Sequence, residues 1–283
     1  MHTLSKRINL LSIALLLLFV TARPPMTHAA DDAKTQVSFC AMGDVPRSPE
    51  EETLLRQQLA ELPTDTDFVI HVGDIKSGKS PCDEAVYEQV AGILTKATIP
   101  VFIIPGDNEW NDCADPGQAW TFWEKHFMRF DRHWQHDFSV FRQLEREENF
   151  SFVRGDVLFI AINIVGGRVH DAQEWSQRLA QDLEWTRRNL RHFGDSVSSS
   201  VVFGHALPAA RHAEFFDGFV KEAEQFGKPL LYLHGDGHRW IHDHPFPAKN
   251  VLRVQVDQGS LAPPLKVTIT NDTHEPFHFD RRM

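Results

Sequence analysis

Five short apolar runs in this chain end in a glycine that is followed at once by an aspartate or a histidine. The pairs are Gly43-Asp44, Gly73-Asp74, Gly106-Asp107, Gly204-His205 and Gly235-Asp236. Apolar runs of this length that stop at a turn residue are typical of buried β-strands. In open α/β sheets the carboxyl ends of the strands line the ligand crevice. We therefore expect these five polar residues to meet at one edge of a sheet.

Strand-like and helix-like segments alternate along most of the chain, as in a sheet covered by helices on its faces. Strands are expected at residues 36–43, 68–73, 100–105, 150–154, 157–164, 200–204, 229–234, 251–256 and 265–270. Helical spacing of apolar residues covers 49–62, 83–97, 118–134, 173–193 and 211–227. From about residue 240 strands follow one another without helices, and we expect a second, partly antiparallel sheet there.

The first thirty residues differ in composition from the rest. Lys6 and Arg7 precede an apolar run at residues 8–20, and Ala29-Ala30 follows, which is the pattern of a signal peptide. The apolar run is shorter than the ~20 residues that cross a bilayer as a helix, although an uncleaved anchor is the alternative. We expect an exported protein, periplasmic or secreted, whose domain spans residues 31–283 and keeps no stable membrane span after cleavage.

Charge and composition exclude some classes of partner and of enzyme. Without the leader the chain has 26 basic and 39 acidic residues, a formal charge of −13. So acidic a chain is not expected to bind nucleic acid. No G-x-S-x-G elbow or G-x-G-x-x-G fingerprint is present, which argues against a serine hydrolase of the α/β-hydrolase type.

Three of the aspartates are spaced by about one β-α-β unit. Asp44 and Asp74 are 30 residues apart, and Asp74 and Asp107 are 33 apart, close to the ~30 residues of such a unit. Carboxylates gathered at one sheet edge repel one another unless cations neutralise them. His205 and His238 add imidazole nitrogens. A single aspartate after glycine is commonly only a turn residue or N-cap, but the ordered set indicates a divalent-metal site.

This ordered set resembles the motifs of the calcineurin-like metallophosphoesterases, which run D-x-H, G-D-x, G-N-H-D/E, a lone His, and G-H-x-H. Residues 73–74, 106–109, 204–205 and 235–238 carry the resemblance, which extends over residues 36–240. It implies a four-layer α/β/β/α sandwich of two mixed sheets flanked by helices. It also implies hydrolysis of a phosphate ester, a phosphorylated small molecule for example, by hydroxide held between two divalent metal ions.

The resemblance assigns six metal ligands. One ion would be held by Asp44 and His238, the other by Asp107, His205 and Asp236, with Asp74 bridging both. Four motif positions depart from the family pattern. Pro46 replaces a metal-binding His, Asp107 an Asn, Asn108 the catalytic His, and Asp236 the first His of G-H-x-H. The two added carboxylates favour Mn²⁺, Mg²⁺ or Ca²⁺ over Zn²⁺.

We expect Asp74 and Asn108 to act in catalysis. An amide at Asn108 can bind a phosphate oxygen but cannot protonate a leaving group. His170 and His212 are candidates for the missing acid, and a substrate with a good leaving group would need none. The changed residue also leaves a second function open, a non-catalytic module that binds metal or a phosphorylated ligand. A zinc-dependent hydrolase of other esters is a third, against which the oxygen-rich ligands argue.

Arg47 and Lys76 follow the first two aspartates closely and are candidates to bind a phosphate oxygen, with solvated surface side chains as the alternative. The loops 73–82 and 105–113 look like a divergent exported branch of the superfamily, and each ends in a cysteine. Cys82 and Cys113 can pair because their loops leave neighbouring strand ends, or they remain two free thiols.

Overall fold

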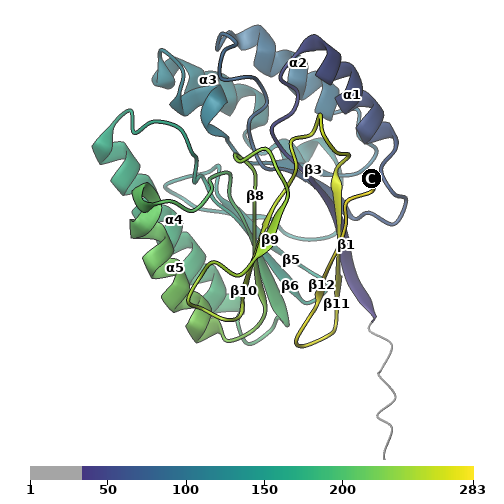
Figure 1. The fold of residues 1–283 in the computed structure, drawn as a ribbon, viewed down its shortest axis with the longest axis vertical. Coiled ribbons are helices and arrows are strands. Elements are labelled where there is room, and N and C mark those ends of the chain that lie inside the picture. Colours follow the sequence, from purple (N-terminus) through teal and green to yellow (C-terminus); the bar gives the residue numbers. More distant parts are fainter. Residues whose placement is uncertain (1–33) are drawn as a thin grey trace, which may run out of the picture. The chain divides into compact units, whose positions relative to one another are not determined.

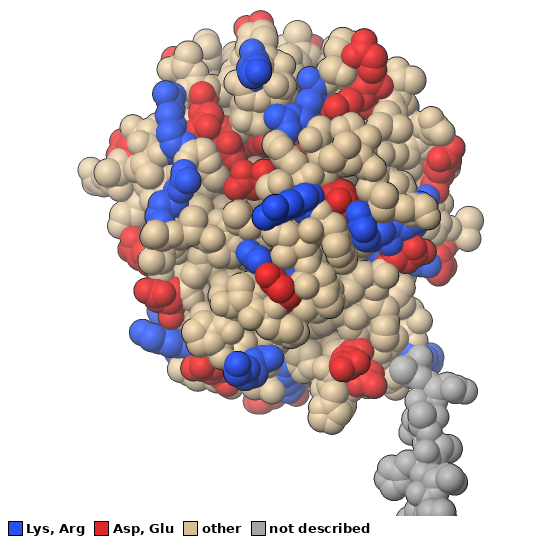
Figure 2. All heavy atoms as spheres, viewed as in Figure 1, with Lys and Arg blue, Asp and Glu red and all other residues tan. Residues whose placement is uncertain are grey.

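The computed structural model describes residues 34–283, so the predicted signal peptide lies outside the described part of the chain. Within residues 34–283 two mixed β-sheets face each other, and helices cover the outer face of each sheet (Figure 1). This arrangement confirms the expected four-layer α/β/β/α fold. In the same range no helix has both the length and the apolar character that crossing a bilayer requires. On the face drawn in Figure 2, basic and acidic side chains are interspersed.

The first sheet has five strands, of which three neighbours run parallel. Its order is β12 (Phe277–Asp280), β11 (Leu265–Thr270), β1 (Thr35–Met42), β2 (Phe68–His71) and β3 (Val101–Ile103). β1, β2 and β3 are parallel, whereas β11 and β12 pair antiparallel. Its outer face is covered by α1 (Pro49–Ala60), α2 (Glu84–Leu94) and α3 (Pro116–Phe127). Parallel neighbours bring their carboxyl ends to one edge.

The second sheet has seven strands and a parallel centre. Its order is β4 (Phe141–Arg142), β5 (Phe150–Arg154), β6 (Val157–Ala161), β7 (Ser199–Phe203), β8 (Leu230–His234), β10 (Val251–Gln255) and β9 (Ile241–Asp243). The strands β6, β7, β8 and β10 are parallel. The helices α4 (Ala172–Phe193) and α5 (Ala213–Phe226) pack on its outer face.

Alternating side chains of the strands fill the layers on either side. In β1, Phe39 and Ala41 face the second sheet, whereas Cys40 and Met42 face the helices of the first. Cys40 is a fully buried free thiol. Phe39 stacks on Phe68, and the rings of the facing sheet meet this pair edge-on. The apolar layer between the sheets fixes their spacing and hence the distance between their strand ends.

Two expectations about the elements are wrong. The strands after residue 240 do not form a sheet of their own, because β9 and β10 join the second sheet while β11 and β12 join the first. The helix expected over 118–134 is interrupted at Arg129, which has a left-handed backbone (φ 56°), and a short 3₁₀ helix, η2 (Phe130–His133), follows it. The three short strands β4, β9 and β12 have too few residues to show a period in the sequence.

Candidate metal centre

The strand ends of both sheets converge where the Gly-Asp and Gly-His pairs stand. Asp44 N–H donates to Gly73 O at 2.9 Å, which joins the turns after β1 and β2. Contacts also cross from the second sheet to the first. Asp236 N–H donates to Asp44 Oδ2 at 3.2 Å, and His205 Nδ1 lies 2.7 Å from Val72 O. The layers of the fold thus bring residues about 190 positions apart into one cluster.

Two groups of possible metal ligands share Asp74. In one group, atoms of Asp44, Asp74 and His238 lie within 4.8 Å of one another, and in the other those of Asp74, Asp107 and His205 do. The resemblance also expected Asp74 between two ions, but it placed Asp236 in the second set of ligands. We call the two groups the His238 half-site and the His205 half-site. Asp44, Asp74, Asp107 and His205 are buried, and His238 is half-buried.

Asp236 belongs to neither group at that distance but lies at the edge of the His205 half-site. Its Oδ2 accepts from Leu207 N–H at 3.2 Å. A Cβ added to Gly166 would lie 2.6 Å from Asp236 Oδ2 and 3.0 Å from Asp107 Oδ1. Both carboxylates therefore pack against the bare face of this glycine. Gly166 carried no signal in the sequence, because another glycine rather than a polar residue follows it.

The backbone of the cluster is unusual. Positive φ values occur at four of the expected ligands, Asp44 (57°), Asp74 (61°), Asp236 (71°) and His238 (61°). Such values are uncommon for residues other than glycine, although aspartate tolerates them better than most, and they concentrate at functional sites. The left-handed turns direct these side chains into the cluster at some cost to folding.

The ring of His205 is oriented to present a lone pair to its half-site. Because a carbonyl oxygen only accepts, the contact with Val72 O places a proton on Nδ1 and leaves Nε2 free to bind a metal. Nε2 lies 3.1 Å from Asp107 Oδ1 and 3.4 Å from Asp74 Oδ1. His205 Nε2 and Asp107 Oδ1 are both buried, and neither forms a well-aligned hydrogen bond within residues 34–283. Buried polar atoms of this kind call for a partner.

The shifted pKa values of Asp74 and His205 also indicate that the cluster needs a cation. Burial, together with the neighbouring carboxylates, raises the pKa of Asp74 well above its usual value. Burial alone would lower the pKa of His205, but Asp74 and Asp107 outweigh it and raise that pKa well above its usual range. The excess negative charge thus attracts protons, and a divalent cation fits in their place.

Asn108 and Glu109 hold Asp74 in position. Asn108 donates from its backbone N–H to Asp74 Oδ1 at 3.0 Å and from its side-chain amide to Asp74 Oδ2. Glu109 is fully buried, and its Oε1 accepts from Gly106 N–H at 2.5 Å and from Asp74 N–H at 3.1 Å. These residues belong to a single π-helical turn, η1 (Asp107–Asn111), a conformation common at functional sites. No pattern in the sequence indicates that turn.

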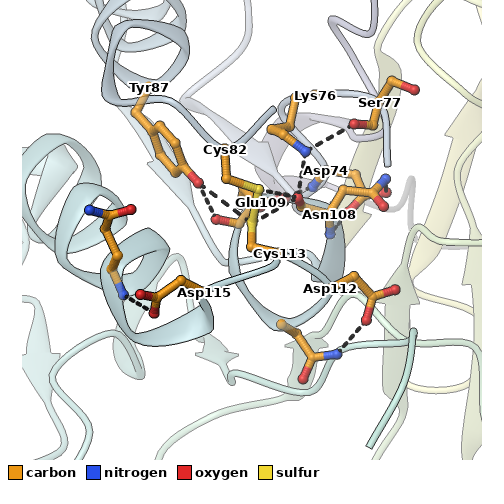
Figure 3. The surroundings of a disulfide bond; sticks show 12 residues. Asp74, Lys76, Ser77, Cys82, Tyr87, Asn108, Glu109, Asp112, Cys113 and Asp115 are labelled. Carbon is orange, nitrogen blue, oxygen red and sulfur yellow. Dashed lines mark hydrogen bonds between the residues drawn. A yellow bond between two sulfur atoms is a disulfide. The ribbon is translucent and has the colours of Figure 1, made fainter. Parts of the chain in front are cut away.

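Lys76 connects the loop after β2 to η1 through hydrogen bonds. Its side chain is buried, and Nζ donates to Ser77 O at 2.9 Å and to Asn108 O at 2.7 Å (Figure 3). With its ammonium bonded to two carbonyls, Lys76 does not reach toward a substrate, and the expected role in phosphate binding has no support from its position. Its contacts instead fix the loop after β2 against η1.

A disulfide joins Cys82 and Cys113, beside the same two loops (Figure 3). Tyr87 of α2 donates from its hydroxyl to Glu109 O at 2.6 Å on the same side of η1. The disulfide and the hydrogen bond from Tyr87 together hold the segment that carries Asp107 and Asn108 in place. The sequence had left pairing and free thiols open, and the structure has the pair.

Arg47, by contrast, faces the ligands. Its Nη1 lies 2.8 Å from Nε2 of His238 and 3.4 Å from Nδ1. The two histidines considered as general acids are otherwise engaged. His212 Nε2 donates to Val165 O at 2.9 Å, and burial lowers the pKa of this ring to about 4, so that it is neutral near pH 7. His170 Nδ1 lies 2.9 Å from Asn111 Oδ1.

A sequence profile of the calcineurin-like phosphoesterases matches residues 38–240, which is most of the chain. The chain belongs to the calcineurin-like phosphoesterase family. Members of this family are metal-dependent phosphoesterases that bind two divalent ions, and the Asp and His groups at the strand ends could hold metal. No curated protein matches the chain significantly in sequence.

Solved structures with the same fold are distant in sequence. One is GAP50, described as the anchor in the inner membrane complex of Plasmodium, at 11% identity and a TM-score of 0.54, with 88% of this chain and 89% of that chain covered. Purple acid phosphatase PPD1 from yellow lupin (Lupinus luteus) has 14% identity and a TM-score of 0.52, with 82% and 49% covered. The 5'-nucleotidase from Candida albicans SC5314 has 14% identity and a TM-score of 0.50, with 87% of this chain and 51% of that chain covered. The chain spans about half of these two enzymes, and at such identities the likeness shows the fold alone.

Proposed function

We propose that this chain is a divalent-metal-dependent phosphoesterase that acts on a phosphate ester. The observation that carries the proposal is the sharing of Asp74 by two ligand groups at the joined strand ends of both sheets. A bound metal supplies the positive charge that activates a water and polarises a phosphate oxygen. The carboxylate-rich ligands favour Mn²⁺, Mg²⁺ or Ca²⁺ over Zn²⁺ in this role.

The chain's own residues prepare the site. Val72 O fixes the ring of His205, and Asn108 and Glu109 fix Asp74, so the ligands need little rearrangement to bind a cation. The guanidinium of Arg47 stands beside His238 with further N–H donors for a phosphate oxygen. Together these residues bind and orient a phosphate group at a largely buried edge of the fold.

The supply of a proton to the leaving group limits the substrates. Asn108 replaces the histidine of the family, and its amide bonds to Asp74. His212 is neutral near pH 7 and its Nε2 proton bonds to a carbonyl. We therefore propose that the enzyme favours esters whose leaving group is a weak base, and that its rate falls steeply as the pKa of the leaving alcohol rises.

Hydrolysis of nitrophenyl phosphate mono- and diesters by the purified domain tests this function. Mn²⁺, Mg²⁺, Ca²⁺ and Zn²⁺ are added in turn, with Asp74→Ala as the inactive variant and the exposed Asp217→Ala as its matched control. We expect metal-dependent turnover in the wild type and in Asp217→Ala that is lost in Asp74→Ala. Equal turnover in Asp74→Ala would refute the proposed site.

A second candidate function is a non-catalytic module that binds metal or a phosphorylated ligand. The bonding of the Asn108 amide to Asp74 favours it, because no catalytic histidine occupies that place. GAP50, with a similar fold, is described as an anchor. Calorimetry separates the two candidates, since the module predicts that metal binds without turnover of any nitrophenyl ester.

We further propose that the protein works outside the cytoplasm, in the periplasm or as a secreted protein. The disulfide between Cys82 and Cys113 supports this location, because such bonds persist in oxidising compartments. Mass spectrometry of the protein recovered from the exported fraction tests it. We expect a mature chain that begins after Ala29 or Ala30, and an intact leader on a cytoplasmic protein would contradict the proposal.

A further inference from the structure

The guanidinium of Arg47 lies within the His238 half-site. Its Nη1 is 2.8 Å from His238 Nε2, the nitrogen that lies 3.1 Å from Asp44 Oδ1. Because Nη1 is also only 3.4 Å from Nδ1, the guanidinium lies against the face of the imidazole ring. A guanidinium stays charged. A cation bound to His238 would therefore stand close to the positive charge of Arg47, which opposes its binding.

The position of Arg47 follows from the chain on either side of it. Its backbone N–H donates to Glu51 Oε2 at 2.7 Å, and Ser48 caps α1 directly afterwards. These contacts anchor the residue at the start of the helix, next to the turn that carries Asp44. Pro46, in the place where the family has a ligand histidine, has no side-chain atom that can bind a metal. The His238 half-site thus lacks one ligand and already contains a positive charge.

The His205 half-site differs in both respects. Val72 O fixes the proton of His205 on Nδ1, and Asp107 contributes a carboxylate in place of the family's amide. Within residues 34–283, no ion pair joins an arginine or lysine to Asp74 or Asp107, whose close basic neighbour is His205. The nearby Lys76 is tied to backbone carbonyls. This half-site keeps its negative charge for a cation from solution.

We infer that the chain binds a single divalent ion tightly, at the His205 half-site, and that Arg47 takes the place of the second ion of the family. The inference rests on the proposed function, which it narrows to a phosphoesterase with one metal. Two ions bridged by Asp74 would stand about 3.5–4 Å apart. The guanidinium against His238 would add a third positive charge beside these two ions. Its repulsion would lower the affinity for the second ion by about tenfold or more.

The test is the Mn²⁺ content of the whole protein and its electron paramagnetic resonance spectrum after removal of free metal. For the wild type we expect about one Mn²⁺ per chain and the spectrum of isolated Mn²⁺. In Arg47→Met, which keeps an apolar stem and loses the charge, we expect a second Mn²⁺ and an exchange-coupled signal. Arg56→Met, at an exposed position of α1, is the matched control and should behave as the wild type.

Each outcome has a distinct meaning. Two coupled ions in the wild type would overturn the inference and leave the proposed phosphoesterase standing. A single ion in both the wild type and Arg47→Met would show that Arg47 is not what excludes the second ion, and would overturn the role assigned to it. If none of the folded variants binds Mn²⁺, as judged beside their circular dichroism, the inference and the proposed metal-dependent function both fall.

Discussion

Replacing Gly166 with alanine should weaken metal binding without unfolding the protein. The added Cβ would lie 2.6 Å from Asp236 Oδ2 and 3.0 Å from Asp107 Oδ1, whereas carbon and oxygen normally approach to about 3.3 Å. At least one carboxylate must move by several tenths of an ångström. Asp236 is half-buried and can turn outward, but it then loses its bond to Leu207 N–H.

Forcing an extra methyl group into a packed site costs about 1–3 kcal/mol. If the metal-bound arrangement bears that cost, the dissociation constant for Mn²⁺ rises by about five- to 150-fold. Calorimetric titration of Gly166→Ala with Mn²⁺ measures the change. The matched control is Gly92→Ala in α2, where nothing lies within 4 Å of the added Cβ. That variant should gain about 0.5–1 kcal/mol of stability and keep the wild-type affinity. An affinity in Gly166→Ala within twofold of the wild type would refute the packing argument.

Three further predictions concern the disulfide, protons at the metal centre and a buried carboxyl. Replacing Cys82 and Cys113, 31 residues apart, with serine should lower the free energy of unfolding by about 4 kcal/mol in urea titrations. A loss below about 1 kcal/mol would contradict the stabilising role given to the disulfide. Mn²⁺ affinity should fall as pH is lowered from 8 to 6, because the raised pKa values of Asp74 and His205 make protons compete with the ion. A pH-independent calorimetric affinity would argue against these ligands. Burial raises the pKa of Asp182 to about 7, so the folded state keeps this proton longer than the unfolded chain, and stability falls as pH rises from about 4 to 7. Asp182→Asn should remove that decline in urea titrations, and an unchanged pH profile would show that another group causes it.

Much of the metal centre could be predicted because its residues follow strands directly. A strand that ends in Gly-Asp places the carboxylate at the sheet edge, so the ordered set of Asp44, Asp74 and Asp107 indicated a shared site although no single one of them did. His205 was found in the same way, after the strand that ends at Gly204, and the family motif then assigned His205 and His238 to separate ions. The long helices and the central strands could also be predicted, since their apolar residues repeat every 3.6 and every 2 residues over a long enough stretch.

What remained hidden depends on contacts between distant segments. Arg47 meets His238 across 191 residues, and no local pattern reports such a pair. Gly166 matters only for the two carboxylates that pack against it. The division of the last four strands between the two sheets follows from pairing with β1 and β8, which the spacing of the strands does not reveal. Lys76 looked available for substrate because its loop was expected at the surface, whereas the loop folds back over η1.

The most direct test of the account measures bound Mn²⁺ and the hydrolysis of nitrophenyl phosphate on the same samples, from chelated protein to saturation. If the cluster around Asp74 performs metal-dependent ester hydrolysis, turnover rises in proportion to bound Mn²⁺ and is absent at both ends of the series in Asp74→Ala. Full turnover in the chelated protein, or saturation with Mn²⁺ and no turnover, would contradict the central claim.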